Sequence, residues 1–136
     1  MRVMATLLPF FCLFACIRIP QTTALDAGLP RILVDGYPLH VERVGSAQQP
    51  PLIVIHGGPG ADMSYLRSLD ALSDTYYIIY YDQRGTGLSA REDPSGHSLE
   101  RFVADLDAVV DAHSGGRPLR MLGHSGTNAR SFSVCR

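Results

Sequence analysis

The 136-residue sequence contains no Trp, only three Cys and no run of Lys or Arg. The Cys residues have neither the C-x-x-C spacing of a zinc site nor the even number of a disulfide framework, which argues against a zinc-built or disulfide-stapled domain. The 12 basic and 13 acidic residues give a formal charge of −1, so the charge provides no basis for binding nucleic acid or an anionic membrane surface. The length allows one globular domain at most.

The first 24 residues have the layout of a secretory signal peptide. Arg2 precedes an almost uncharged stretch from Val3 to Ile17, and Thr22 and Ala24 supply small residues around a candidate cleavage site after Ala24. The apolar stretch contains Pro9 and falls short of the roughly 18 residues of a membrane-spanning helix, which favours a cleaved signal over an uncleaved anchor. We therefore expect an extracytoplasmic protein, either periplasmic or secreted.

A second candidate cleavage site lies before Cys16. The tetrapeptide Leu13-Phe14-Ala15-Cys16 resembles a bacterial lipobox, in which the Cys becomes modified with lipid. This alternative predicts a chain held at a membrane by a lipid at its N-terminus and by no other membrane contact.

After residue 30, short apolar runs alternate with segments of helical spacing. Two runs around a turn-forming group at Gly36 predict a β-hairpin, and three further runs predict strands. The predicted strands are 31–35, 39–44, 52–55, 76–81 and 119–122. The runs 52–55 and 76–81 are continuously apolar, as expected for central strands that are covered on both faces.

Two segments between these strands predict helices. Apolar residues from Tyr65 to Leu72 have helical spacing, and this helix is expected to begin near Asp62. A second helix follows Ser98, which is a suitable N-cap. Its expected apolar stripe is Leu99, Phe102, Val103, Leu106, Val109 and Val110, and its expected solvated face carries Asp105, Asp107 and Asp111. Strands joined through helices require a parallel sheet with right-handed crossovers, so we predict an open α/β sheet preceded by an antiparallel hairpin.

Three predicted strands are followed directly by a Gly-rich motif. In order, these are His56-Gly57-Gly58-Pro59-Gly60, Asp82-Gln83-Arg84-Gly85-Thr86-Gly87-Leu88-Ser89 and Gly123-His124-Ser125-Gly126-Thr127. In open α/β sheets, the loops beyond the carboxyl ends of the strands build the ligand site. The three motifs are therefore the candidate active site.

The third motif resembles a nucleophile elbow, a tight strand-to-helix turn that exposes a Ser hydroxyl. Ser125 is the candidate nucleophile, although Thr127 stands where the pattern G-x-S-x-G has its closing Gly. A tetrahedral oxyanion needs two backbone N–H donors aimed at one point, and we expect Gly58 and Gly126 to supply them. His56 is expected to be a packing residue of its loop and not the catalytic base.

The middle motif has a competing interpretation. Its 85–90 segment matches G-x-G-x-x-A, the outline of a dinucleotide-binding turn. That turn normally opens into an apolar helix, whereas residues 91–96 contain two helix breakers and no apolar period. We therefore expect no nucleotide cofactor, and we interpret Asp82 and Arg84 as an ion pair that braces the loop.

Together, the three motifs resemble the proline iminopeptidase branch of the α/β-hydrolase superfamily, roughly over residues 31–125. The resemblance implies an α/β-hydrolase fold and a serine aminopeptidase that removes an N-terminal residue, often Pro, from a peptide substrate. In that scheme Ser125 attacks the carbonyl carbon and the N–H groups of Gly58 and Gly126 hold the oxyanion. A His that is oriented by an Asp, both further along the chain, acts as the base. The resemblance implies no metal and no organic cofactor.

The sequence departs from this scheme after the nucleophile. The usual order along the chain is Ser, then Asp or Glu, then His. The residues from Gly126 to Arg136 include none of these acids and no His, and all five His residues precede Ser125. A Ser hydroxyl without a base is a poor nucleophile, so we expect an N-terminal fragment that is inactive alone.

The expected organisation is a signal peptide (1–24), a linker (25–30), a truncated α/β-hydrolase domain (31–126) that ends at the nucleophile elbow, and an irregular tail (127–136). Two alternatives remain open. One is an esterase or another hydrolase of the same superfamily, acting on small esters. The other is a non-catalytic binding or assembly module, and the sequence does not indicate an oligomeric state.

Overall fold

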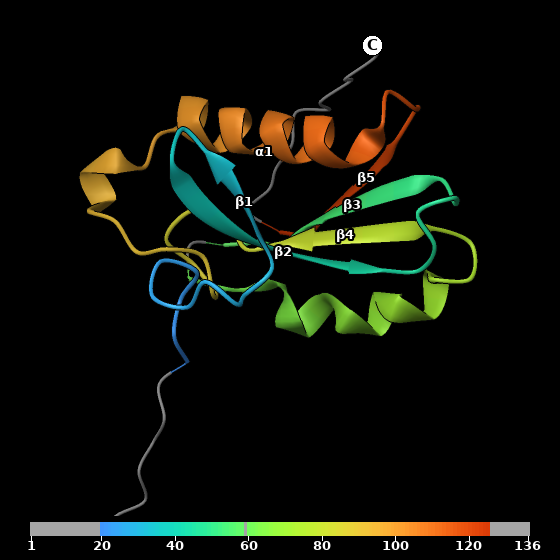
Figure 1. Ribbon diagram of the computed structural model, residues 1–136, viewed down its shortest axis with the longest axis horizontal. Coiled ribbons are helices and arrows are strands. Elements are labelled where there is room, and N and C mark those ends of the chain that lie inside the picture. The colour runs from blue at the N-terminus through green and yellow to red at the C-terminus, as the bar shows by residue number, and fades with distance from the viewer. Residues whose placement is uncertain (1–19, 59, 126–136) are drawn as a thin grey trace, which may run out of the picture.

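Five strands form one mixed sheet with a helix on each face, in a computed structural model that describes residues 20–58 and 60–125 (Figure 1). The strand order is β1-β2-β4-β3-β5. The strands are β1 (Arg31–Val34), β2 (Tyr37–Val44), β3 (Pro51–Ile55), β4 (Tyr77–Tyr81) and β5 (Arg120–Gly123). The first two pairings along this order, β1 with β2 and β2 with β4, are antiparallel, whereas β3 pairs in parallel with both β4 and β5. The predicted combination of a hairpin and parallel strands is confirmed.

The hairpin closes through a two-residue turn. Asp35 and Gly36 both have positive φ angles, 50° and 81°, as in the turns that match the twist of paired strands. Because these two residues complete the turn, Tyr37 already pairs with Val34. Strand β2 therefore begins at Tyr37, two residues before the predicted start at Leu39.

The central strands are buried on both faces, as their continuous apolar runs predicted. Ile53 and Ile79 face a cluster that contains Leu106 and Val109, while Val54 and Ile78 face a cluster that contains Met63. Successive side chains of a strand point to opposite faces, so each strand contributes to both layers of the core.

The helix α1 (Leu99–Ser114) covers one face of the sheet. Ser98 caps its N-terminus by accepting a hydrogen bond from the N–H of Arg101, and it ends at Gly115, whose left-handed φ of 58° is typical of a helix C-terminus. The predicted helix is confirmed, but its stripe begins later than expected, because Leu99 is 70% exposed.

The 3-10 helix η1 (Met63–Leu72) covers the other face and is capped by Asp62, which accepts a hydrogen bond from the N–H of Ser64. Met63, Leu66 and Leu69 face the sheet. This spacing of three residues follows from the three residues per turn of a 3-10 helix. The expected stripe assumed 3.6 residues per turn, so it wrongly included Tyr65 and Leu72, which are exposed.

Two predicted segments lie outside the described residues. They are the leader up to residue 19, which includes Cys16, and the tail together with Gly126. A further short 3-10 helix, η2 (Pro94–Gly96), precedes α1.

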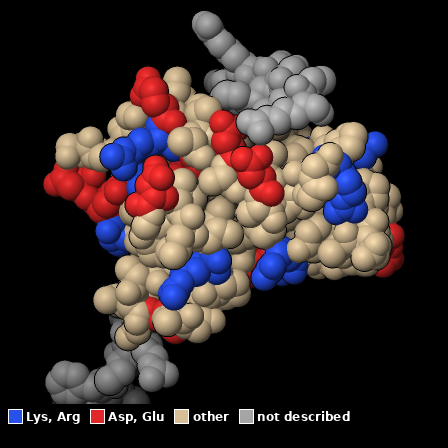
Figure 2. Space-filling view, turned by 45° about the horizontal axis from the view of Figure 1, so that its top comes forward, with Lys and Arg blue, Asp and Glu red and all other residues tan. Residues whose placement is uncertain are grey.

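In the ranges 20–58 and 60–125, no helix has the length and apolar character needed to cross a bilayer. On the face shown in Figure 2, the described basic side chains form no continuous surface and lie among acidic and uncharged ones.

Candidate active site

The carboxyl ends of β3, β4 and β5 meet at one edge of the sheet. Ile55, the last residue of β3, is in register with Tyr81 on one side and with Gly123 on the other. The three Gly-rich motifs follow directly after these residues, so parallel pairing places them side by side. The expectation that residues 56–60, 82–89 and 123–127 share one edge is confirmed for the described part of each motif.

Ser125 has a strained backbone conformation. Its φ of 56° lies in the left-handed region that non-glycine residues rarely adopt. Ser125 is the second residue after the end of β5, and His124 lies between them. Such a conformation costs on the order of 1–3 kcal/mol and persists where the surrounding structure enforces it. A strained turn at the end of a strand is the geometry that presents a nucleophilic Ser in a G-x-S-x-G elbow.

The loop after β3 lies directly against this turn. A Cβ atom placed on Gly57 would lie 2.8 Å from the Cβ of Ser125 and would overlap the carbonyl oxygen of His124. Only Gly fits at this position, because the overlap involves a backbone atom that cannot rotate away. The close contact holds the loop that carries Gly58 beside Ser125, as the oxyanion arrangement requires.

The N–H groups of this loop differ in their engagement. The N–H of Gly57 donates to the hydroxyl of Tyr65 over 2.8 Å, whereas the N–H of Gly58 has no hydrogen-bond partner among the described residues. Gly58 also has a φ of 64°, and a Cβ placed on it would meet no atom within 4 Å. The N–H of Gly58 is therefore available to bind an oxyanion, while Gly126 lies outside the described residues.

Tyr65 also contacts the elbow itself, which the sequence did not indicate. Its hydroxyl lies 3.0 Å from Nδ1 of His124, and the two rings meet edge to face with their centroids 5.4 Å apart. The sequence offered only a Tyr within a helical pattern, and no pattern connects positions 65 and 124.

His56 is a fully buried structural residue. Its Nε2 accepts the N–H of Gln83 over 3.0 Å, and the side chain of Gln83 donates to the carbonyl of His56 over 2.6 Å. These bonds join the loop after β3 to the loop after β4. Since its Nε2 lone pair is already occupied, His56 has the packing role expected of it and is not placed to accept a proton from Ser125.

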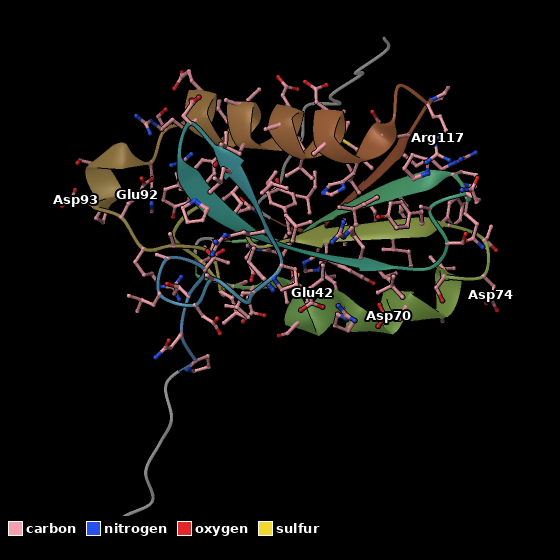
Figure 3. All side chains as sticks on the ribbon, viewed as in Figure 1. Glu42, Asp70, Asp74, Glu92, Asp93 and Arg117 are labelled. Atoms are coloured by element: carbon pink, nitrogen blue, oxygen red, sulfur yellow. The ribbon has the colours of Figure 1, made fainter. Side chains whose placement is uncertain are left out.

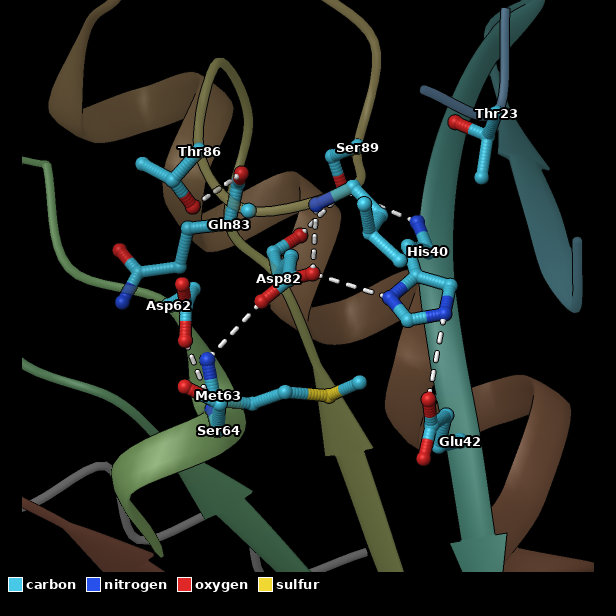
Figure 4. Close-up of polar contacts among 12 residues, drawn as sticks. Thr23, His40, Glu42, Asp62, Met63, Ser64, Asp82, Gln83, Thr86 and Ser89 are labelled. Carbon is cyan, nitrogen blue, oxygen red and sulfur yellow. Dashed lines mark hydrogen bonds and ion pairs between the residues drawn. The ribbon is translucent and has the colours of Figure 1, made fainter. Parts of the chain in front are cut away.

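Asp82 anchors the middle motif to two other elements (Figure 4). Its buried carboxylate accepts hydrogen bonds from Nδ1 of His40 at 2.9 Å, from the N–H of Met63 at 2.9 Å and from the N–H of Leu88 at 2.8 Å. Burial opposes ionisation, but these hydrogen bonds outweigh it and hold the pKa of Asp82 below its usual value.

The expected ion pair between Asp82 and Arg84 is therefore wrong. The guanidinium of Arg84 binds both carboxylate oxygens of Asp105 on α1, at 2.9 and 2.7 Å, and also contacts Glu92 at 3.2 Å. Strand β4 ends at Tyr81, so the alternation of a strand no longer governs the next residues, and Asp82 and Arg84 turn to different partners.

Asp105 corrects a second expectation. Its side chain is 1% exposed and pairs with Arg84, whereas the helical pattern placed it on the solvated face of α1. Arg84 is almost as buried and stacks over the ring of Tyr37, with 3.9 Å between its Cζ and the ring centroid. Glu92, which contacts Arg84, lies on the segment that leads into α1 (Figure 3).

A cavity of about 400 Å³ lies beside Asp82, and Ser125 is not among the residues that line it. His40, Glu42 and Arg67 are among its lining residues. Within residues 20–58 and 60–125, no group of three or more His, Cys, Asp or Glu side chains is arranged to hold a metal ion.

Comparison with known proteins agrees with this geometry. Residues 50–126, more than half of the chain, match the family described as alpha/beta hydrolase fold. The chain belongs to this family. The predicted fold class, a partial α/β-hydrolase domain that reaches the nucleophile elbow, is thereby confirmed.

Within this family, the chain resembles proline iminopeptidases. It is 38% identical over 95 residues to the proline iminopeptidase of Lactobacillus helveticus, in a match that covers 66% of this chain and 32% of the relative. A solved structure of a proline iminopeptidase-related protein from Thermus thermophilus is 32% identical with a TM-score of 0.63, covering 71% of this chain and 35% of that one. The resemblance expected from the motifs is confirmed.

Other relatives carry other names. A protein of Mycobacterium tuberculosis named as a probable oxidoreductase is 31% identical over 91 residues, covering 66% of this chain and 15% of the relative. A structure of epoxide hydrolases from hot-environment metagenomes is 26% identical with a TM-score of 0.61, covering 71% of this chain and 33% of that one. The chain spans about a third of the length of the proline iminopeptidases it matches.

Proposed function

We propose that this chain carries the nucleophile and oxyanion donors of a serine aminopeptidase of the proline iminopeptidase type, which releases N-terminal residues, often Pro, from peptides. The observation that carries the proposal is the left-handed backbone of Ser125, with a φ of 56°, pressed against the Gly57-Gly58 loop. The 38% identity to a proline iminopeptidase supports the choice of peptide substrates.

In the proposed reaction, the hydroxyl oxygen of Ser125 attacks the carbonyl carbon of the first residue of the peptide. The carbonyl oxygen becomes an oxyanion, and the N–H groups of Gly58 and Gly126 donate hydrogen bonds to it. The base that took the Ser125 proton gives it to the leaving nitrogen as the C–N bond breaks, which leaves an acyl ester on Ser125. Water then hydrolyses this ester, which releases the N-terminal residue and restores the Ser125 hydroxyl. Each oxyanion donor contributes a factor on the order of 10² to 10³ in rate.

In the usual triad order, the proton of Ser125 passes to a His further along the chain, and no His follows Ser125 in these 136 residues. Of the His residues that precede Ser125, His40 and His56 are buried and engaged in structural contacts. We therefore propose that a polypeptide limited to these residues turns over substrate no faster than its Ser125→Ala variant.

A chimeric enzyme tests the peptide substrate. Residues 31–125 of this chain replace the matching segment of the Lactobacillus helveticus proline iminopeptidase, and hydrolysis of proline para-nitroanilide is compared with that of para-nitrophenyl acetate. We expect the folded chimera to cleave the anilide, and Ser125→Ala to lower this rate by a factor on the order of 10⁴ or more.

Two results would contradict the proposal. A folded chimera that cleaves only the ester would indicate an esterase. Anilide hydrolysis that survives Ser125→Ala would remove Ser125 from the reaction. The matched control is Ser95→Ala, which changes an exposed Ser on η2 and is expected to leave both rates unchanged.

A further inference from the structure

Tyr65 joins two of the three motifs through a single hydroxyl group. It lies in the first turn of η1, where its oxygen receives the N–H of Gly57 at 2.8 Å and lies 3.0 Å from Nδ1 of His124. Gly57 belongs to the loop after β3, and His124 immediately precedes Ser125. One side chain therefore spans the oxyanion loop and the nucleophile turn.

The groups present fix the direction of one of the two hydrogen bonds. A backbone N–H can only donate, so the Tyr65 oxygen accepts from Gly57. The contact with Nδ1 of His124 takes its direction from the tautomer of that ring: the hydroxyl donates to an unprotonated Nδ1, and its second lone pair accepts from a protonated one. In either tautomer one hydroxyl group binds both motifs.

Packing does not account for the placement of Tyr65. Its side chain is 45% exposed, whereas Met63 and Leu66 bury the face of η1 that meets the sheet. Because so much of the ring remains in water, its specific contacts are the two polar ones and the edge-to-face contact with His124.

We propose that Tyr65 is a positioning residue of the active site. By binding the N–H of Gly57, it fixes the orientation of the loop, so that the N–H of Gly58 is the one presented to the substrate. By binding His124, it holds the turn that carries Ser125 at a fixed distance from that donor. This inference rests on the proposed function, because the alignment matters only if Ser125 and Gly58 act on the same carbonyl group.

Heteronuclear NMR of the full isotope-labelled chain tests the bridge without any enzymatic activity. In the unmodified chain we expect the ring-nitrogen shifts of His124 to show a hydrogen bond at Nδ1. In Tyr65→Phe we expect the amide hydrogen of Gly57 to exchange at least about fivefold faster, because one hydrogen bond is lost. The amide resonance of Gly58 and the ring signals of His124 are expected to shift together with it.

Tyr80→Phe is the matched control. It removes a Tyr hydroxyl that donates to Asp70 of the same helix over 2.8 Å, so it also weakens the contact of η1 with the sheet. We expect it to leave the signals of Gly57, Gly58 and His124 unchanged. Equal shifts in both variants would mean that Tyr65 acts only through the stability of the helix, and would overturn the proposal.

The unmodified chain provides a second, independent criterion. Ring-nitrogen shifts that show no hydrogen bond at Nδ1 of His124 would contradict the bridge even if Tyr65→Phe does not fold. These readouts concern the bridge alone, whereas the Ser125→Ala comparison in the chimera concerns the proposed function, so failure of one is distinguishable from failure of the other.

Discussion

The Nδ1–H of His40 donates a hydrogen bond to Asp82 over 2.9 Å, and both side chains are 1% exposed. The same carboxylate accepts the N–H groups of Met63 and Leu88. It therefore ties β2, η1 and the loop after β4 together beneath the sheet edge that carries Ser125 (Figure 4).

Lowering the pH should weaken this junction. The pKa of Asp82 is lower in the folded chain than its unfolded value of about 4, so the ionised group stabilises the fold above that pH. This contribution is lost as the pH falls through the lowered pKa. We expect the free energy of unfolding in urea to decrease between about pH 5 and pH 2.

Asp82→Asn should reduce that pH dependence and destabilise the chain at pH 7 by about 3 kcal/mol, because it disrupts a buried charged hydrogen-bond network. Asp74→Asn changes an exposed carboxylate and serves as the control. If both variants retain the same pH profile as the unmodified chain, Asp82 does not have this role.

Removing the partner of Arg84 should be among the most destabilising changes at a polar position. Asp105→Ala leaves Arg84, which is 4% exposed, with the longer contact to Glu92 as its one remaining ion pair among the described residues. We expect a loss of about 3–5 kcal/mol in the free energy of unfolding. Asp107→Ala, on the exposed side of the same helix, should cost less than about 0.5 kcal/mol. Equal effects in urea denaturation would contradict the assignment of Asp105 to the core.

The strain at Ser125 predicts a variant that is more stable. Ser125→Gly should raise the free energy of unfolding by about 1 kcal/mol, because Gly adopts a positive φ without the clash of a Cβ. Ser125→Ala keeps the Cβ and should leave stability unchanged. Asp35→Gly is the comparison at the other non-glycine residue that has a positive φ within residues 20–58 and 60–125. Asp tolerates the left-handed region, so the gain there should be smaller. A loss of stability in Ser125→Gly would argue against strain.

Thr23 makes specific contacts with the fold although it lies within the predicted leader. It is 1% exposed, its N–H donates to the carbonyl of Leu88 over 2.8 Å, and its hydroxyl donates to the carbonyl of Pro38 over 2.8 Å. Cleavage after Ala24 would remove these contacts, whereas cleavage before Cys16 would keep them.

We therefore expect the chain recovered after expression in a secreting bacterium to retain Thr23. Intact-mass measurement of the purified protein identifies its first residue directly. A mature chain that begins at Leu25 and unfolds at the same urea concentration as one that retains Thr23 would contradict this expectation.

The strands and α1 were predictable because local signals specify them. The runs that became β3 and β4 are apolar without interruption, and Ser98 caps a helix with a regular stripe. Partners of charged residues were not predictable in the same way. Arg84 and Asp105 come together only where the chain leaves β4 and α1 packs on the sheet. No periodicity in the local sequence indicates this long-range contact.

The candidate site also contains residues that local signals specify and one that they do not. Ser125 and Gly58 could be predicted from the sequence because they lie in motifs at strand ends, and parallel strands bring those ends together. The position of Tyr65 could not be predicted from the sequence, because it depends on η1 being a 3-10 helix. That geometry turns Tyr65 away from the core and toward His124, whereas the spacing expected of an α-helix placed it in the apolar stripe.

In the proposed reaction, Ser125 is a nucleophile held beside an oxyanion donor. The most direct measurement is the rate at which an alkyl fluorophosphonate modifies each Ser of the purified chain at alkaline pH, followed by peptide mapping. We predict that Ser125 reacts faster than the exposed Ser95 by a factor on the order of 10² or more, since the oxyanion donors act even without a base. Modification of Ser125 at the same rate as Ser95 in the folded chain would contradict the claim.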